Sequence, residues 1–214
     1  MSMLSGTPNA GFCAEHCAQG IVAGVDEAGR GPLAGPVVAA AVVLCHPAPA
    51  DLADSKTMTP RRRALADEAV RTRCAWAVAI VGPNEIDALN IFGATMAAMT
   101  RATALLSQTI GAEPERVLVD GNMTPAGRVT EWRWPAEALV KGDAREPAIS
   151  AASIVAKEWR DRLMLAAARE HPHYGWERNK GYPTRDHLAA LRRHGPTPLH
   201  RRSFAPVAQA EMFG

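Results

Sequence analysis

The sequence has few cysteines, no long apolar run and no secretion signal. Four cysteines among 214 residues are too few and too irregularly spaced for a disulfide framework, so we expect reduced thiols. A membrane-spanning helix needs about 20 apolar residues, and no run in the chain approaches that length. Residues 1–20 lack the basic segment and apolar core of a signal peptide. We therefore expect a cytoplasmic protein.

One group of residues near the start has the spacing of metal ligands. Cys13 and Cys17 flank His16, but no second matching pair follows them. A structural zinc site needs four ligands. We therefore expect residues 1–20 to be a flexible leader, with zinc binding as the alternative.

Lysine is also scarce. Only four of the 24 basic residues are lysines, and each lies in a short polar or glycine-containing segment: Lys56, Lys141, Lys157 and Lys180. A compact ammonium group is not equivalent to a planar guanidinium. Lysine at these positions indicates sites where arginine serves poorly, and chance retention at the surface is the alternative.

The charge is distributed unevenly along the chain. The formal net charge is +2, but residues 1–140 carry −3 and residues 141–202 carry +6. A cationic face late in the chain suits a polyanion such as a nucleic acid better than a membrane.

Hydrophobic patterning predicts an α/β domain. The apolar, β-branched runs predict five strands, and the residues between them have helical spacing. Three antiparallel strands followed by crossover strands imply a mixed five-stranded sheet flanked by helices. We expect one domain over 21–207, with a helical part from about 170 and a tail at 208–214. The predicted strands are 21–26, 37–44, 75–81, 117–120 and 138–142, and the main predicted helices are 60–72, 92–109, 149–169 and 185–194, with a short helix from 84.

Acidic residues end three of these strands. Asp26 and Glu27 close the first, Asp120 closes the fourth, and Asp143 follows the fifth. A buried carboxylate without a partner costs several kcal/mol, and the usual partner is a cation. Oxygen ligands favour Mg²⁺ or Mn²⁺ over zinc, and two such ions could activate water and stabilise a leaving oxygen. The alternative for each acid alone is a strand-end or turn residue.

The glycine-rich stretch after the first strand has a second interpretation. Gly29, Gly31 and Ala34 formally match the fingerprint of a dinucleotide-binding loop. That fingerprint requires a helix to begin within the glycines, whereas Pro32, Pro36 and the valines that follow predict a strand. We therefore favour the metal site over a nucleotide-dependent oxidoreductase.

Seven segments, in this order along the chain, resemble bacterial ribonuclease HII over about residues 20–207. The likeness is collinear and its longer segments are far more specific than a lone metal motif. The segments are Gly24–Val37, Asp54–Lys56, Val119–Asn122, Lys141–Asp143, Ile149–Lys157, Lys180–Thr184 and His200–Phe204.

The resemblance implies a fold, an activity and a metal site. Members of the family have the ribonuclease H fold, use Mg²⁺ or Mn²⁺, and cut 5′ to ribonucleotides embedded in duplex DNA or in RNA/DNA hybrids. By the same likeness, Asp26, Glu27, Asp120 and Asp143 are the catalytic, metal-binding acids. A monomer that removes ribonucleotides from DNA is the expected protein.

The resemblance also implies residues that contact the substrate. Gly29, Arg30 and Gly31 would place backbone groups against the ribose 2′-hydroxyl, the group that distinguishes RNA from DNA. Tyr182 would pack against the sugar at the RNA-to-DNA junction.

Other basic residues are expected at the phosphates. Lys56, Arg201 and Arg202 would contact phosphates and supply affinity rather than selectivity. We interpret Arg61, Arg62 and Arg63 as a solvated helix face. One departure from the family pattern is Ala205, where a glycine is expected.

Two other functions remain open at this point. One is a related nuclease of the same fold that cuts other nucleic-acid structures. The other is a binding protein that uses the acids only to dock a cation.

Overall fold

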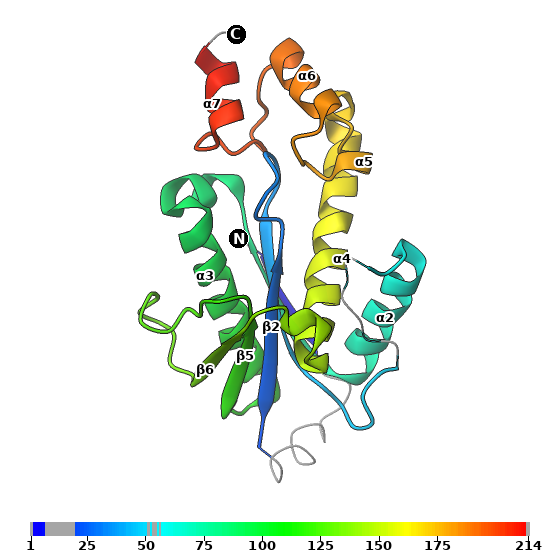
Figure 1. The fold of residues 1–214 in the computed structure, drawn as a ribbon, viewed down its shortest axis with the longest axis vertical. Coiled ribbons are helices and arrows are strands. Elements are labelled where there is room, and N and C mark those ends of the chain that lie inside the picture. The colour runs from blue at the N-terminus through cyan, green and yellow to red at the C-terminus, as the bar shows by residue number, and fades with distance from the viewer. Residues whose placement is uncertain (1, 7–19, 51, 53–54, 56, 213–214) are drawn as a thin grey trace.

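The computed structural model describes residues 2–6, 20–50, 52, 55 and 57–212 (Figure 1). Cys13, His16, Cys17 and Lys56 lie outside the described residues. The zinc alternative and the phosphate contact of Lys56 therefore stay predictions.

The strands form one mixed sheet in the order β1-β4-β3-β2-β5-β6. Strands β1, β4, β3 and β2 are antiparallel neighbours, whereas β2, β5 and β6 run parallel. This confirms the predicted α/β class with a mixed sheet. The strands are β1 (Ser2–Gly6), β2 (Val22–Ala28), β3 (Val37–Val43), β4 (Ala75–Val81), β5 (Arg116–Asp120) and β6 (Ala136–Leu139).

The sheet has six strands rather than the expected five. Ser2–Gly6, expected within a leader, pairs with β4. Because β4 is almost entirely apolar and buried, an uncovered edge there would be prone to association, and β1 covers it.

The last strand begins and ends earlier than the predicted 138–142. It pairs with β5 only from Ala136 to Leu139. The chain then turns at Lys141, whose φ of 56° is left-handed, into a short 3₁₀ helix, η1 (Gly142–Ala144).

The helices agree with the predicted ranges to within two or three residues in most cases. The predicted helices near 84 and 92–109 form α3 with a break at Asn90, where φ is 56°. Helix α7 extends through Met212, whereas a tail was expected from 208. None of the helices in the described part of the chain is long and apolar enough to span a membrane. The helices are α2 (Pro60–Arg73), α3 (Pro83–Ile110), α4 (Pro147–Glu170), η2 (Pro172–Tyr174), α5 (Trp176–Asn179), α6 (Arg185–His194) and α7 (Ala205–Met212).

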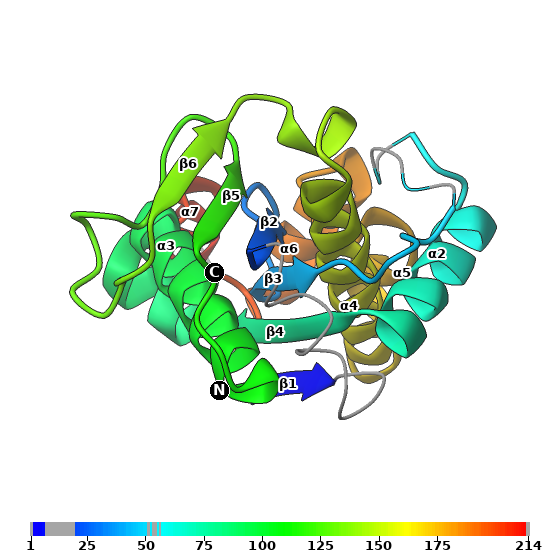
Figure 2. The same ribbon diagram turned by 90° about the horizontal axis from the view of Figure 1, so that it is seen from below.

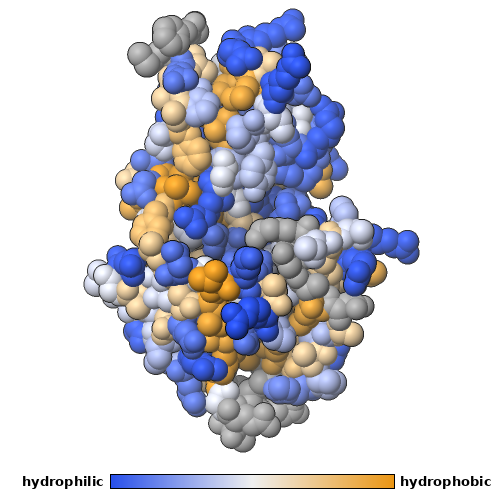
Figure 3. Space-filling view, in the orientation of Figure 1, coloured by the Kyte–Doolittle hydropathy of each residue, from blue (hydrophilic) through white to orange (hydrophobic). Residues whose placement is uncertain are grey.

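The sheet lies between two helical layers (Figure 2). Helix α3 covers one face, and α4, with α2 beside it, covers the other. Helices α5, α6 and α7 gather beyond one end of the sheet in Figure 1. Hydrophilic residues cover much of the face shown in Figure 3, and hydrophobic residues gather between α6 and α7.

Gly24 sets how closely α4 approaches the sheet. A Cβ atom on Gly24 would lie 2.1 Å from the carbonyl carbon of Ala148, in the first turn of α4. The contact is with backbone, which cannot rotate away. The missing side chain therefore lets the start of α4 pack directly on β2.

We predict that Gly24→Ala lowers the free energy of unfolding by at least about 2–3 kcal/mol, because α4 must move off the sheet. In a chain of this length the melting temperature should fall by roughly 5–10 °C. Gly82→Ala is the matched control, since nothing lies within 4 Å of its Cβ position. Equal melting temperatures for the two variants would contradict the close contact.

Candidate metal centre and nucleic-acid pocket

Three carboxylates converge at the carboxyl end of the parallel strands. Asp26 of β2, Asp120 of β5 and Asp143 of η1 each offer an oxygen, and these three oxygens lie within 4.8 Å of one another. Because Val25 is paired with Val119 in parallel register, Asp26 and Asp120 follow at the same level of the sheet. The convergence expected from the strand ends is thus present for these three acids.

Asp120 also brings Asp143 into position. Its Oδ1 accepts hydrogen bonds from the backbone N–H of Gly142 at 2.8 Å and of Asp143 at 3.3 Å. A carboxylate that accepts two N–H groups holds a turn firmly. The end of β5 therefore fixes the turn that carries the third acid.

Glu27 is not one of the three acids whose oxygens converge. Successive strand residues point to opposite faces, but Glu27 lies at the end of β2, and its carboxyl group interacts with that of Asp26. Its carboxylate lies on the pocket wall and pairs with Arg30 at 3.4 Å. Glu27 stays a predicted ligand.

The electrostatics of the acids favour a bound cation. Burial raises the pKa of Asp26 well above its usual value, and the charges of Glu27 and Asp120 raise it further. Hydrogen bonds from Ser153 and the N–H of Glu27 act against this rise. Burial likewise raises the pKa of Glu27, although Arg30 opposes it. A hard divalent cation fits this crowded set of oxygen donors.

Asp26, Glu27 and Asp120 line an open pocket of about 250 Å³. Ser55, Ser153 and Lys157 also line it, and the Oγ atoms of the two serines are 2.8 Å apart. The rest of the lining includes the loop at Gly29–Gly31, Tyr182 and Arg160.

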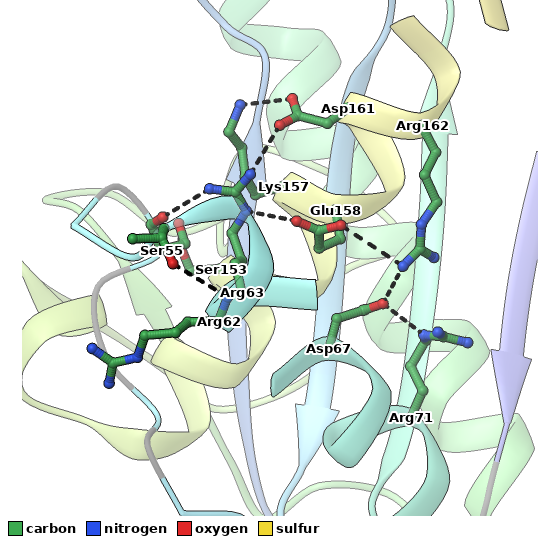
Figure 4. Close-up of polar contacts among 11 residues, drawn as sticks. Ser55, Arg62, Arg63, Asp67, Arg71, Ser153, Lys157, Glu158, Asp161 and Arg162 are labelled. Atoms are coloured by element: carbon green, nitrogen blue, oxygen red, sulfur yellow. Dashed lines mark hydrogen bonds and ion pairs between the residues drawn. The ribbon is translucent and has the colours of Figure 1, made fainter. Parts of the chain in front are cut away.

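A polar network between α2 and α4 holds part of this lining (Figure 4). Arg63 bonds the carboxylate of Glu158 at 2.7 Å and that of Asp161 at 3.3 Å, and donates to the carbonyl of Ser55 at 3.3 Å. Asp161 also accepts from Lys157 at 2.6 Å. The network thereby orients both Ser55 and Lys157, which line the pocket.

Two buried guanidinium groups fix the loop of Gly29–Pro36. Arg201 donates to the carbonyl oxygens of Gly29, Arg30 and Gly35. Arg160 donates to those of Ala34 and Pro36, and also of Lys180 in the segment before Tyr182. These contacts join the glycine loop to the C-terminal helical part.

The direction of these carbonyls sets the direction of the neighbouring N–H groups. In a trans peptide the C=O and N–H point in opposite directions. Since the carbonyls of Gly29 and Arg30 point to Arg201, the N–H groups of Arg30 and Gly31 point away from it. Gly29 is required here, because its φ is 99° and a Cβ would lie 2.0 Å from Arg160.

A family model described as Ribonuclease HII matches residues 23–207. The chain belongs to the ribonuclease HII family. It is therefore a ribonuclease H, an endoribonuclease that acts on RNA in RNA/DNA substrates.

Two relatives named Ribonuclease HII match over most of their length. That of Erythrobacter litoralis is 61% identical over 211 residues, which are 99% of this chain and 100% of the relative. That of Novosphingobium aromaticivorans is 65% identical over 195 residues, which are 90% of this chain and 100% of the relative.

Solved structures share the fold. The ribonuclease H2 of Pyrococcus horikoshii has a TM-score of 0.70 at 25% identity, covering 89% of this chain and 97% of its own. A Bst-RNase HIII structure solved in complex with Mn²⁺ also has a TM-score of 0.70, at 20% identity, covering 95% of this chain and 73% of its own. These matches confirm the ribonuclease H-like architecture.

The sequence predicted that Arg201 of this ribonuclease HII contacts a phosphate. The structure places its side chain in the interior instead. It is 0% exposed, and burial lowers its pKa to about 9. Its guanidinium donates to three backbone carbonyls and lies over the ring of Phe204, so a phosphate cannot reach it without displacing the loop. The predicted phosphate contact is wrong for Arg201, which instead holds the glycine loop. Arg202 is exposed and pairs with Glu211, and its phosphate contact stays a prediction.

Arg63 is the second correction. We expected Arg61–Arg63 to form a solvated face, but Arg63 is buried against Glu158 and Asp161. Ser55, Ser153, Lys157 and Arg160 were missing from the predicted site. Two signals were available: Ser55, Ser153 and Lys157 lie in segments that carry the family resemblance, and Lys157 is one of only four lysines.

We predict that Asp26→Asn stabilises the metal-free protein by at least about 1 kcal/mol at pH 8. The raised pKa means that the folded state loses stability as pH rises from the ordinary value of 3.8 through the raised pKa, so the penalty is fully present above both. Denaturant unfolding in chelator measures the change.

The same variant should lose most of the rise in melting temperature that Mn²⁺ gives to the parent protein. Glu131→Gln, at an exposed acid outside the pocket, should keep that rise. A full Mn²⁺ effect in Asp26→Asn would exclude Asp26 as a ligand.

We predict that Arg201→Lys lowers the free energy of unfolding by about 2–3 kcal/mol, because one ammonium cannot satisfy three carbonyls in the same geometry. Arg202→Lys, at an exposed neighbour, should change it by less than about 0.5 kcal/mol. Unchanged stability of Arg201→Lys, with a loss of DNA affinity alone, would restore the phosphate role.

Proposed function

We propose that this pocket hydrolyses the phosphodiester bond on the 5′ side of a ribonucleotide embedded in duplex DNA or in an RNA/DNA hybrid. The observation that carries the proposal is that Asp26 and Asp120 of the acidic cluster line the same pocket as the Gly29–Gly31 loop and Tyr182. Bond cleavage and recognition of the sugar can therefore occur on adjacent nucleotides.

The acids form the hydrolytic side. Asp26, Asp120 and Asp143 would hold Mg²⁺ or Mn²⁺, with two ions in the reacting complex and Glu27 as a further ligand. Such ions supply an activated water and neutralise charge on the leaving oxygen. Ser153 donates to Asp26 and so keeps one carboxylate oxygen oriented.

The reaction proposed for this site consumes one water. Its oxygen bonds to phosphorus, the bond from phosphorus to the 3′-oxygen of the preceding nucleotide breaks, and that oxygen takes up a proton. The products are a 3′-hydroxyl and a 5′-phosphate on the ribonucleotide. The 2′-hydroxyl of that ribonucleotide is thus recognised and does not attack.

The glycine loop and Tyr182 form the selective side. The N–H groups of Arg30 and Gly31, directed away from Arg201, would donate to the 2′-hydroxyl. A deoxyribose would leave them without this partner. Tyr182 is about half exposed, and its ring lies 3.4 Å from the position of a Cβ on Gly31, so it would pack against the sugar.

Two basic side chains would hold the backbone of the duplex. Lys56 and Arg202 are the proposed phosphate contacts, consistent with the positive charge of residues 141–202. We further propose that the protein acts as a monomer, in the cytoplasm, in the removal of ribonucleotides from DNA.

A paired cleavage assay tests the function. In Mg²⁺, a duplex with one ribonucleotide should be cut once, immediately 5′ to it, and the matched all-DNA duplex should stay intact. Asp26→Asn should reduce cleavage to background, whereas Glu131→Gln should cleave normally. Equal cutting of both duplexes would favour a nuclease without ribose selection, and cleavage by folded Asp26→Asn would reject the metal site.

A further inference from the structure

Two buried histidines lie side by side next to the main chain of Tyr182. His187 belongs to α6 and His200 to the segment between α6 and α7, and both are almost fully buried. Their Nε2 atoms are 3.1 Å apart. Two facing ring nitrogens can form a hydrogen bond only if one carries a proton and the other does not.

The surroundings of His200 decide its tautomer. Its Nδ1 accepts a hydrogen bond from the backbone N–H of Thr197 at 2.9 Å. A backbone N–H can only donate, so Nδ1 carries no proton. The neutral ring therefore carries its proton on Nε2 and donates to His187.

His187 has the complementary tautomer. Its Nδ1 lies 2.9 Å from the carbonyl oxygen of Tyr182, which can only accept, so Nδ1 carries the proton. Its Nε2 is then an acceptor and faces two donors, the Nε2–H of His200 and the indole N–H of Trp176 at 3.1 Å. The tautomer assigned to His187 thus agrees with the tautomer assigned to His200.

The pair is stable only when both rings are neutral. A proton added to either ring would place two N–H donors face to face. The rings of Tyr174 and Trp176 pack around the pair, and His171 adds a further like charge if protonated. Burial lowers the pKa of both histidines, that of His200 to about 3.

The carbonyl of Tyr182 connects the histidines to the pocket. It accepts from both His187 and the N–H of Thr184, the latter at 2.8 Å. Pro183 further restricts the backbone of Tyr182 to extended conformations. The hydrogen bonds to its carbonyl therefore fix the main chain of Tyr182. Its ring is exposed and lines the pocket beside Gly31.

We propose that His187 and His200 form a neutral, tautomer-locked pair that fixes the main chain of Tyr182 and so positions its ring for the ribonucleotide. The proposal rests on the proposed function, in which Tyr182 contacts the sugar. His187 is a positioning residue, since it acts through Tyr182 and does not line the pocket.

The tautomers can be tested without activity. Imidazole ¹⁵N NMR of the intact protein at pH 7 should show His187 protonated at Nδ1 alone and His200 at Nε2 alone. His187→Asn and His200→Gln assign the two signals. The opposite tautomers, or rapid exchange between tautomers in either ring, would overturn the proposal.

A double-mutant cycle tests the action through Tyr182. His187→Leu removes the donor and should lower kcat/KM on the single-ribonucleotide duplex about tenfold, the effect of one buried hydrogen bond. His187→Asn keeps an N–H donor near the position of Nδ1 and should recover most of that loss. In a Tyr182→Ala background, His187→Leu should have almost no further effect.

The outcomes distinguish a failure of the positioning role from a failure of the proposed function. An equal loss in both backgrounds, or His187→Asn no better than His187→Leu, would show a general structural role and reject the positioning role. If His187→Leu does not fold, His187→Gln takes its place in both backgrounds, because its amide reaches the position of Nε2 and leaves the carbonyl of Tyr182 without the Nδ1–H donor. If the parent protein does not select ribonucleotides, the proposed function fails, while the NMR result still decides the tautomers.

Discussion

The convergence of like charges at the end of two parallel strands is the constraint on which the rest of the site depends. Asp26 and Asp120 are adjacent because β2 and β5 are paired in register, and Asp120 holds the turn that carries Asp143. Such crowding of carboxylates raises the free energy of the folded protein until a cation binds. The fold tolerates this cost because α4 packs closely on β2 at Gly24 and because Ser153 of α4 forms a hydrogen bond with Asp26.

The pocket has two sides that are built by different parts of the chain. The sheet and η1 supply the acids, and the proposed sugar contacts depend on the C-terminal part. There the buried Arg201 and Arg160 direct the carbonyls of the glycine loop inward, and the histidine pair supports Tyr182. In the proposed function, selectivity would therefore depend on residues that are distant in sequence from the acids and that need not touch the substrate.

The sequence predicted the fold class and the convergence of Asp26, Asp120 and Asp143 because both follow from local signals. Apolar runs indicate where the strands lie. An acid at the end of a buried strand is either a cation ligand or a turn residue. Pairing of Ser2–Gly6 with β4 was not predictable, since that short segment has no strong pattern and is held by an edge elsewhere in the sheet.

The burial of Arg63 and Arg201 could not be predicted either. Arginines in short basic runs are usually exposed to solvent. Only the fold shows that Arg63 pairs with a buried carboxylate and that Arg201 donates to loop carbonyls. The histidine pair could not be predicted either, because it depends on tertiary structure. His187 and His200 are 13 residues apart, and their contact requires α6 to pack against the segment that follows it.

The most direct test of the account is anomalous diffraction from a crystal of the protein grown with Mn²⁺. The account predicts a strong manganese peak among the carboxylate oxygens of Asp26, Asp120 and Asp143, at bonding distance from each. An empty site in an otherwise ordered crystal, or oxygens dispersed away from one another, would contradict it.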